Sequence, residues 1–110
     1  MPKQTVLDRV FHALADPTRR TVIERLTAGP RSTTELAQPI EMTLPSFTQH
    51  LAVLEGAGLV TSSKAGRVRT YRLTPDELEA AGGWLAAQRN LWERRLDQLD
   101  DFLTTLQEQP

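Results

Sequence analysis

Cysteine is absent from this sequence of 110 residues, and that absence excludes disulfide bonds and thiolate metal ligands. Long apolar runs are missing as well, since no stretch approaches the roughly 20 residues that a membrane-spanning helix needs. Residues 1–4 lead into an amphipathic segment and not into the apolar core of a signal peptide. Repeats, low-complexity tracts and Gly/Ser linkers are also lacking. We therefore expect a single cytoplasmic domain over residues 1–110.

Motifs of enzyme active sites are lacking too. The sequence contains no Gly-rich phosphate loop and no nucleophile elbow. No pocket signature accompanies its acidic residues, so paired catalytic acids are not indicated. We predict that the protein is not an enzyme and that it uses no cofactor.

The net charge of −1 hides an uneven distribution. Residues 1–72 carry ten Lys and Arg against six Asp and Glu, whereas residues 73–110 carry three against eight. Between Met42 and Leu73 the single acid, Glu55, is outnumbered by one lysine and three arginines. Phosphate contact requires a local basic patch of this kind, so the segment is compatible with nucleic acid although the whole chain is not basic.

Helical patterns occupy the first quarter of the chain. Apolar residues recur at helical spacing over residues 5–15. Asp16 and Pro17 then begin a second helix, with Asp as the N-cap and Pro at the first helical position. Gly29-Pro30 ends it.

A helix-turn-helix is predicted for residues 32–58. Ser32 and Glu35 have the spacing of a capping box at the start of a short helix. Thr43 is the expected cap of the next helix, which is the candidate for reading DNA. The buried stripe of that helix is predicted to consist of Phe47, Leu51 and Leu54.

The remaining chain predicts a wing and one long helix. Two β-rich runs within residues 59–73 are joined through Lys64-Ala65-Gly66, which is a hairpin pattern. A helix is expected over residues 75–106, with a kink, a break or a close helix crossing at Gly82-Gly83 because glycine is unfavourable inside helices. The fold class is therefore mainly α with a small β-hairpin, a winged helix-turn-helix.

The polar side chains of the second helix and the basic side chains of the wing are of the kinds that bind double-stranded DNA. Gln can bond adenine through both the carbonyl oxygen and the NH₂ of its amide, and Ser and Thr can contact bases or phosphates. An Arg at a wing tip can enter the minor groove or hold phosphates. The alternative interpretations are that the helix is simply polar on its solvent-facing side and that the arginines of the wing only make an edge strand soluble. The candidate DNA-binding residues are Ser46, Thr48, Gln49, His50, Lys64, Arg67 and Arg69.

The sequence resembles the ArsR/SmtB family of bacterial winged-helix repressors in F-H-A-L-A-D-P-T-R-R and in L-P-S-F-T-Q-H-L-A-V-L-E-G-A-G-L-V followed by G-R-V-R-T-Y-R-L. The resemblance implies a homodimer that binds an imperfect inverted repeat and represses transcription until a signal releases it. It also implies that residues 46, 48, 49 and 50 occupy recognition-helix positions and that Arg67 is the wing arginine.

Two departures from the family concern metal sensing. The family's thiolate site needs cysteines in the helix that here reads E-L-A-Q-P-I, and its other common site needs histidines on the last helix, which has none. The last helix, W-L-A-A-Q-R-N-L-W-E-R-R-L-D-Q-L-D-D-F-L, is similar to a metal-free subgroup. No metal site is predicted.

The long last helix carries apolar residues at seven-residue spacing, which indicates association through this helix and the first one. Closure of the monomer's own core is the alternative. The predicted dimer-interface residues are Val6, Val10, Phe11, Leu85, Trp92, Leu96, Leu99 and Leu103.

The sequence thus predicts a homodimeric, sequence-specific DNA-binding transcriptional regulator, a repressor acting on an inverted repeat. A protein-interaction module that docks a partner through the C-terminal helix is the alternative from another class. A third possibility is a sensor that binds an unknown small organic effector between the C-terminal helices, with Trp84 and Trp92 lining the pocket. No membrane partner is expected.

Overall fold

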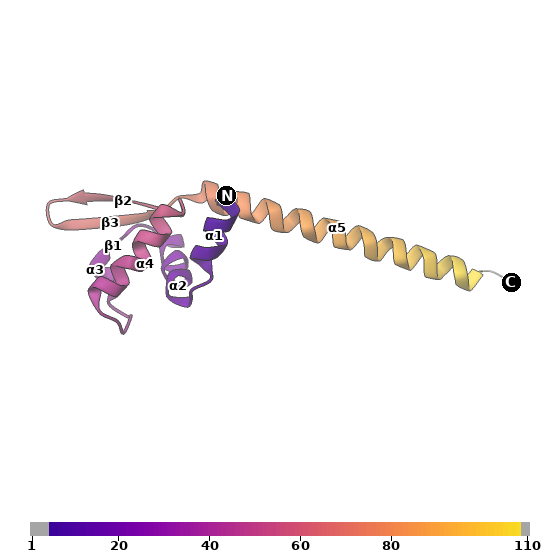
Figure 1. Ribbon diagram of the computed structural model, residues 1–110, viewed down its shortest axis with the longest axis horizontal. Helices are drawn as coiled ribbons and strands as arrows, with labels where there is room; N and C mark the ends of the chain where they lie inside the picture. The colour runs from indigo at the N-terminus through magenta and orange to yellow at the C-terminus, as the bar shows by residue number, and fades with distance from the viewer. Residues whose placement is uncertain (1–4, 109–110) are drawn as a thin grey trace.

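The computed structural model describes residues 5–108, so both ends of the predicted domain, 1–4 and 109–110, lie outside the described residues. The described part is mainly helical with a small antiparallel sheet, which confirms the predicted fold class (Figure 1). In chain order the elements are α1 (Val6–Leu14), α2 (Pro17–Thr27), β1 (Arg31–Ser32), α3 (Thr33–Ala37), α4 (Leu44–Gly56), β2 (Val60–Ala65), β3 (Val68–Leu73) and α5 (Pro75–Glu108).

Side-chain caps fix where the short helices begin. The Asp16 carboxylate accepts from the main-chain N–H of Arg19 at the start of α2. Ser32 and Glu35 form a reciprocal capping box at α3, and Thr43 caps α4. Each cap satisfies a main-chain donor that the helix itself leaves unpaired. These three predicted helix starts are confirmed.

The core lies under the inner face of α4. Phe47, Leu51 and Leu54 are fully buried, as predicted, and pack with residues from α2, α3 and the base of the hairpin. Burying a side chain of this size stabilises the fold by about 1.5–3 kcal/mol. The opposite face of α4 is therefore forced outward.

The sheet contains one strand that the sequence did not predict. β1 pairs with β3, which gives the strand order β1-β3-β2. It consists only of Arg31 and Ser32, which pair with Tyr71 and Thr70. A two-residue strand is too short to show a pattern of alternation, so only its partner in space defines it. β1 anchors the hairpin to the helix-turn-helix.

The last helix corrects one prediction. α5 runs without a break through Gly82 and Gly83. Apart from the neighbouring residues and the helix's own backbone, no atom of the described residues lies within 4 Å of the Cβ position at either glycine, so no close helix crossing occurs there. Beyond its contact with α1 the helix projects away from the rest of the molecule, whose long axis measures 79 Å (Figure 1). None of the helices described here has the length and apolarity to cross a membrane.

Candidate nucleic-acid interface

The outward face of α4 presents the predicted reading residues Ser46, Thr48 and Gln49, all exposed. Ser46 and Thr48 make local hydrogen bonds, Ser46 with the cap Thr43 and Thr48 with the carbonyl of Pro45 at 2.9 Å. Over residues 5–108 the amide of Gln49 makes no hydrogen bond. This amide is therefore free to contact a base edge.

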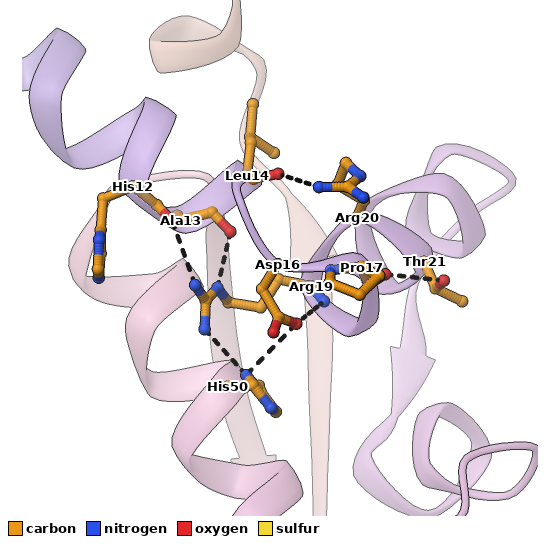
Figure 2. A network of polar contacts seen from close by, with 9 residues as sticks. All are labelled: His12, Ala13, Leu14, Asp16, Pro17, Arg19, Arg20, Thr21 and His50. Carbon is orange, nitrogen blue, oxygen red and sulfur yellow. Dashed lines mark hydrogen bonds and ion pairs between the residues drawn. The ribbon is translucent and has the colours of Figure 1, made fainter.

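His50, the fourth predicted reading residue, is placed differently. Its side chain is only 22% exposed, and its Nδ1 lies 3.0 Å from Nη1 of Arg19 and 3.7 Å from Oδ2 of Asp16 (Figure 2). One edge of the ring thus faces α2 and not solvent. His50 therefore links α4 to α2, a role that its predicted position on the outer helical face did not indicate.

Arg67 lies at the tip of the wing. Only Gly66 and Arg67 separate the paired residues Ala65 and Val68. Gly66 has a φ of +63°, and glycine with positive φ at this first position is typical of a type II′ hairpin turn. The exposed Arg67 therefore lies at the end of the hairpin, between β2 and β3.

Lys64 and Arg69 are directly opposite each other on the two strands of the wing. Like charges at such a pair destabilise a sheet, so their presence indicates a surface that gains from an anion. Both side chains are exposed. Together with Arg67 they form a basic hairpin end, defined here as the wing tip.

A polar chain that the sequence did not predict ties the wing to α4. Nη1 of Arg69 donates to Oγ of Ser62 at 2.9 Å, and Ser62 in turn donates to the carboxylate of Glu55 at 2.8 Å. Glu55 is on α4, Ser62 on β2 and Arg69 on β3. The chain fixes the angle between the outer face of α4 and the wing, and it occupies part of the Arg69 guanidinium.

Asp16 and Arg19 are also site residues that the prediction missed. Asp16 was predicted only as a helix cap, and no local pattern marks Arg19. Burial tends to raise the pKa of Asp16, but the main-chain N–H of Arg19 and nearby positive charge outweigh it and hold that pKa below its ordinary value. The charged carboxylate is therefore favoured in the folded protein.

The predicted dimer-interface residues divide into two groups. Val10 is fully buried in the core of its own chain, so it has no surface left for a partner and that prediction is corrected. The others are each at least 38% exposed within a single chain. These uncovered residues are Val6, Phe11, Leu85, Trp92, Leu96, Leu99 and Leu103. Four further exposed apolar side chains on α5 were not in the predicted set: Trp84, Leu91, Phe102 and Leu106.

The two tryptophans contact their own chain. Trp84 packs edge to face on Phe11 with ring centroids 5.8 Å apart, which joins α5 to α1. Arg95 lies over the ring of Trp92 at 5.8 Å. No pocket is present in the described part of a single chain. The same residues, 5–108, bring no three His, Asp or Glu side chains together as metal ligands.

Comparison with known proteins decides the family. A family described as "Helix-turn-helix domain" matches residues 14–63. The HTH-type transcriptional regulator Rv2034 of Mycobacterium tuberculosis (strain ATCC 25618 / H37Rv) is 47% identical over 73 residues, which cover 66% of this chain and 68% of that protein. The crystal structure of an ArsR family transcriptional regulator, RHA00566, superposes with a TM-score of 0.77 at 48% identity, covering 80% of this chain and 91% of that one. The chain belongs to the ArsR family of transcriptional regulators.

Membership of the ArsR family confirms the resemblance seen in the sequence and the prediction of a regulator and not an enzyme. The transcriptional repressor SdpR of Bacillus subtilis (strain 168) is a further relative, 28% identical over 79 residues that cover 72% of this chain and 88% of SdpR. Placement in a metal-free subgroup stays a prediction.

The lowered pKa of Asp16 predicts how stability responds to acid. A depressed pKa in the folded state stabilises the fold at neutral pH, and this contribution disappears as the pH falls through the folded pKa, below about 4. Asp16→Asn keeps a good N-cap but cannot titrate. We expect the free energy of unfolding, measured with urea, to fall less between pH 7 and pH 3 in Asp16→Asn than in the wild type. An equal fall in both proteins would contradict the assignment.

Proposed function

We propose that the protein is a homodimeric repressor that binds an imperfect inverted repeat in double-stranded DNA. The outer face of α4 enters the major groove, and the wing tip holds the flanking backbone or minor groove. One observation carries this proposal. The unbonded amide of Gln49 and the basic wing tip lie on two elements that the hydrogen-bond chain Glu55–Ser62–Arg69 joins. The name of the relative SdpR, a transcriptional repressor, supports repression.

The exposed face of α5 supports the dimer. From Trp92 onward, apolar residues alternate at spacings of four and three, the pattern of a coiled-coil seam. This stripe, with Leu96, Leu99, Leu103 and Leu106, is at least 48% exposed at every position in a single chain. A second copy covers it and brings two α4 helices to half-sites about 34 Å apart.

The experiment begins with selection of a duplex from a random pool by the full chain, followed by mobility shifts at several salt concentrations. We expect a selected site with two related half-sites and an affinity that falls with salt. Recovery of no preferred sequence would overturn the proposal, and absence of any shift at low salt would favour the protein-interaction module.

Arg67→Ala is expected to weaken binding to every duplex. Loss of one phosphate contact lowers the slope of log affinity against log salt by about 1 per chain. Titration of the selected and an unrelated duplex at several salt concentrations measures both slopes. The matched control is Arg94→Ala, which removes the same charge from an exposed position on α5. Equal slopes for Arg67→Ala and the wild type would contradict the wing assignment.

Gln49→Ala should instead change sequence preference. Losing the bidentate contact to one base reduces discrimination at that position by about 1–3 kcal/mol, while unrelated duplexes bind as before. Competition with duplexes mutated one base pair at a time identifies the position. Gln98→Ala, on α5, provides the control. Unchanged preference at all positions would show that Gln49 does not read a base.

Leu99→Glu is expected to separate the dimer, because it buries a charge in the apolar seam without a partner. Sedimentation velocity should give twice the mass of one chain for the wild type and a single-chain mass for the variant. Gln98→Glu introduces the same charge at the adjacent position, off the seam, and should remain dimeric. A single-chain mass for the wild type at micromolar concentration would contradict the interface.

A further inference from the structure

Arg19 joins three helices through one guanidinium group. Its Nε donates to the carbonyl of Ala13 at 2.7 Å, and Nη2 donates to the carbonyl of His12 at 3.1 Å, both at the end of α1. Nη1 lies 3.0 Å from Nδ1 of His50 on α4 (Figure 2). Arg19 itself is on α2. All three guanidinium nitrogens are therefore engaged, and their geometry is fixed.

This contact determines where the proton sits on the His50 ring. Arginine has donors and no acceptor, so Nδ1 of His50 must accept from Nη1 through its lone pair. The Asp16 carboxylate, 3.7 Å from the same Nδ1, is beyond hydrogen-bonding distance and its Oδ2 already accepts from the main-chain N–H of Arg19 at 3.0 Å. The neutral ring consequently carries its hydrogen on Nε2.

Nε2 lies on the other side of the ring and is open to solvent. It makes no hydrogen bond within residues 5–108, and it is not among the buried polar atoms that lack a partner there. Figure 2 shows it pointing away from Arg19 and Asp16. His50 follows the exposed Gln49 in α4 and is itself of intermediate burial, so it lies at the border between the exposed and the buried face of the helix.

We propose that Arg19 is a positioning residue that holds His50 as the Nε2–H tautomer and directs this N–H to a phosphate oxygen of bound DNA. The proposal rests on the proposed function of α4 as the recognition helix. A phosphate is the fitting acceptor because the half-buried ring is held against Arg19 of α2 and is less exposed than Gln49, and contacts to phosphates position a protein on the duplex.

The tautomer can be tested without DNA. Long-range ¹H–¹⁵N correlation spectra of the ring at pH 8 should show Nδ1 as an acceptor and Nε2 as protonated in the wild type. Arg19→Ala should shift both nitrogens toward a mixture of tautomers. Arg20→Ala is the matched control, because Arg20 donates to the carbonyl of Leu14 at 2.8 Å and makes no contact with His50. A ring signal that is identical in Arg19→Ala and the wild type would overturn the proposal.

Two variants of His50 distinguish the hydrogen bond of Nδ1 with Arg19 from the proposed hydrogen bond of Nε2 with a phosphate. His50→Asn places an amide oxygen near the position of Nδ1 but provides no donor at Nε2, whereas His50→Gln places an amide nitrogen near Nε2. We expect His50→Asn to bind the selected and unrelated duplexes about tenfold more weakly, as for one lost charge-assisted hydrogen bond, and His50→Gln to stay within about threefold of the wild type. The reverse order, or a loss confined to one base position, would overturn the phosphate contact.

A double-mutant cycle of Arg19→Ala and His50→Asn tests whether Arg19 acts on DNA binding through His50. Arg19→Ala should weaken DNA binding about tenfold with His50 present and by less than about twofold in the His50→Asn background, because the donor it directs is then already missing. An equal loss in both backgrounds would assign Arg19 a general structural role and overturn the proposal. Unfolding in urea accompanies each measurement. If Arg67→Ala and Gln49→Ala behave as expected while this cycle shows no coupling, only the inference about Arg19 fails.

Discussion

Burial of one apolar stripe on α4 is the constraint on which the rest of the molecule depends. Phe47, Leu51 and Leu54 fill the core, and their burial determines the rotation of the helix about its own axis. The same rotation turns Gln49 outward. Because a cost of several kcal/mol opposes exposure of these three side chains, Gln49 is kept on the outer face although its own side chain makes no hydrogen bond within the described residues.

The burial of this stripe does not determine the tilt of α4 relative to the other elements. Two polar contacts restrain that tilt. Near the middle of α4, His50 is bonded to Arg19 and so to the end of α1. Near its C-terminus, Glu55 is bonded through Ser62 to the wing. The bonds of Arg19 with Ala13 and His50 and the bond between Ser62 and Glu55 are partly buried, where hydrogen bonds are stronger than at the surface, whereas the bond between Arg69 and Ser62 is exposed. These contacts consequently restrain the orientation of the outer face of α4 relative to the wing.

The sequence allowed the helix starts, the core stripe and the hairpin to be predicted, because caps, periodicity and turn residues are local patterns. Three features depended on contacts between residues distant in the sequence. The partner of β1 is about forty residues away, the Arg19–His50 contact spans 31 positions, and Val10 is distinguished from its exposed neighbours on α1 only by what packs over it. Helix propensity was also misleading at Gly82-Gly83, because the cost of two unfavourable residues is outweighed by the hydrogen bonds of a 34-residue helix.

The length of α5 has a thermodynamic consequence. At 1.5 Å per residue the helix extends about 51 Å. Past its contact with α1, this helix is supported within the described residues by its own main-chain hydrogen bonds and by contacts between its own side chains, such as Arg95 over Trp92. A helical segment of that size is marginally stable alone in water. In the proposed dimer, helix formation in the distal half of α5 and association of two chains would therefore be one equilibrium, and the helical content of the protein would rise with its concentration.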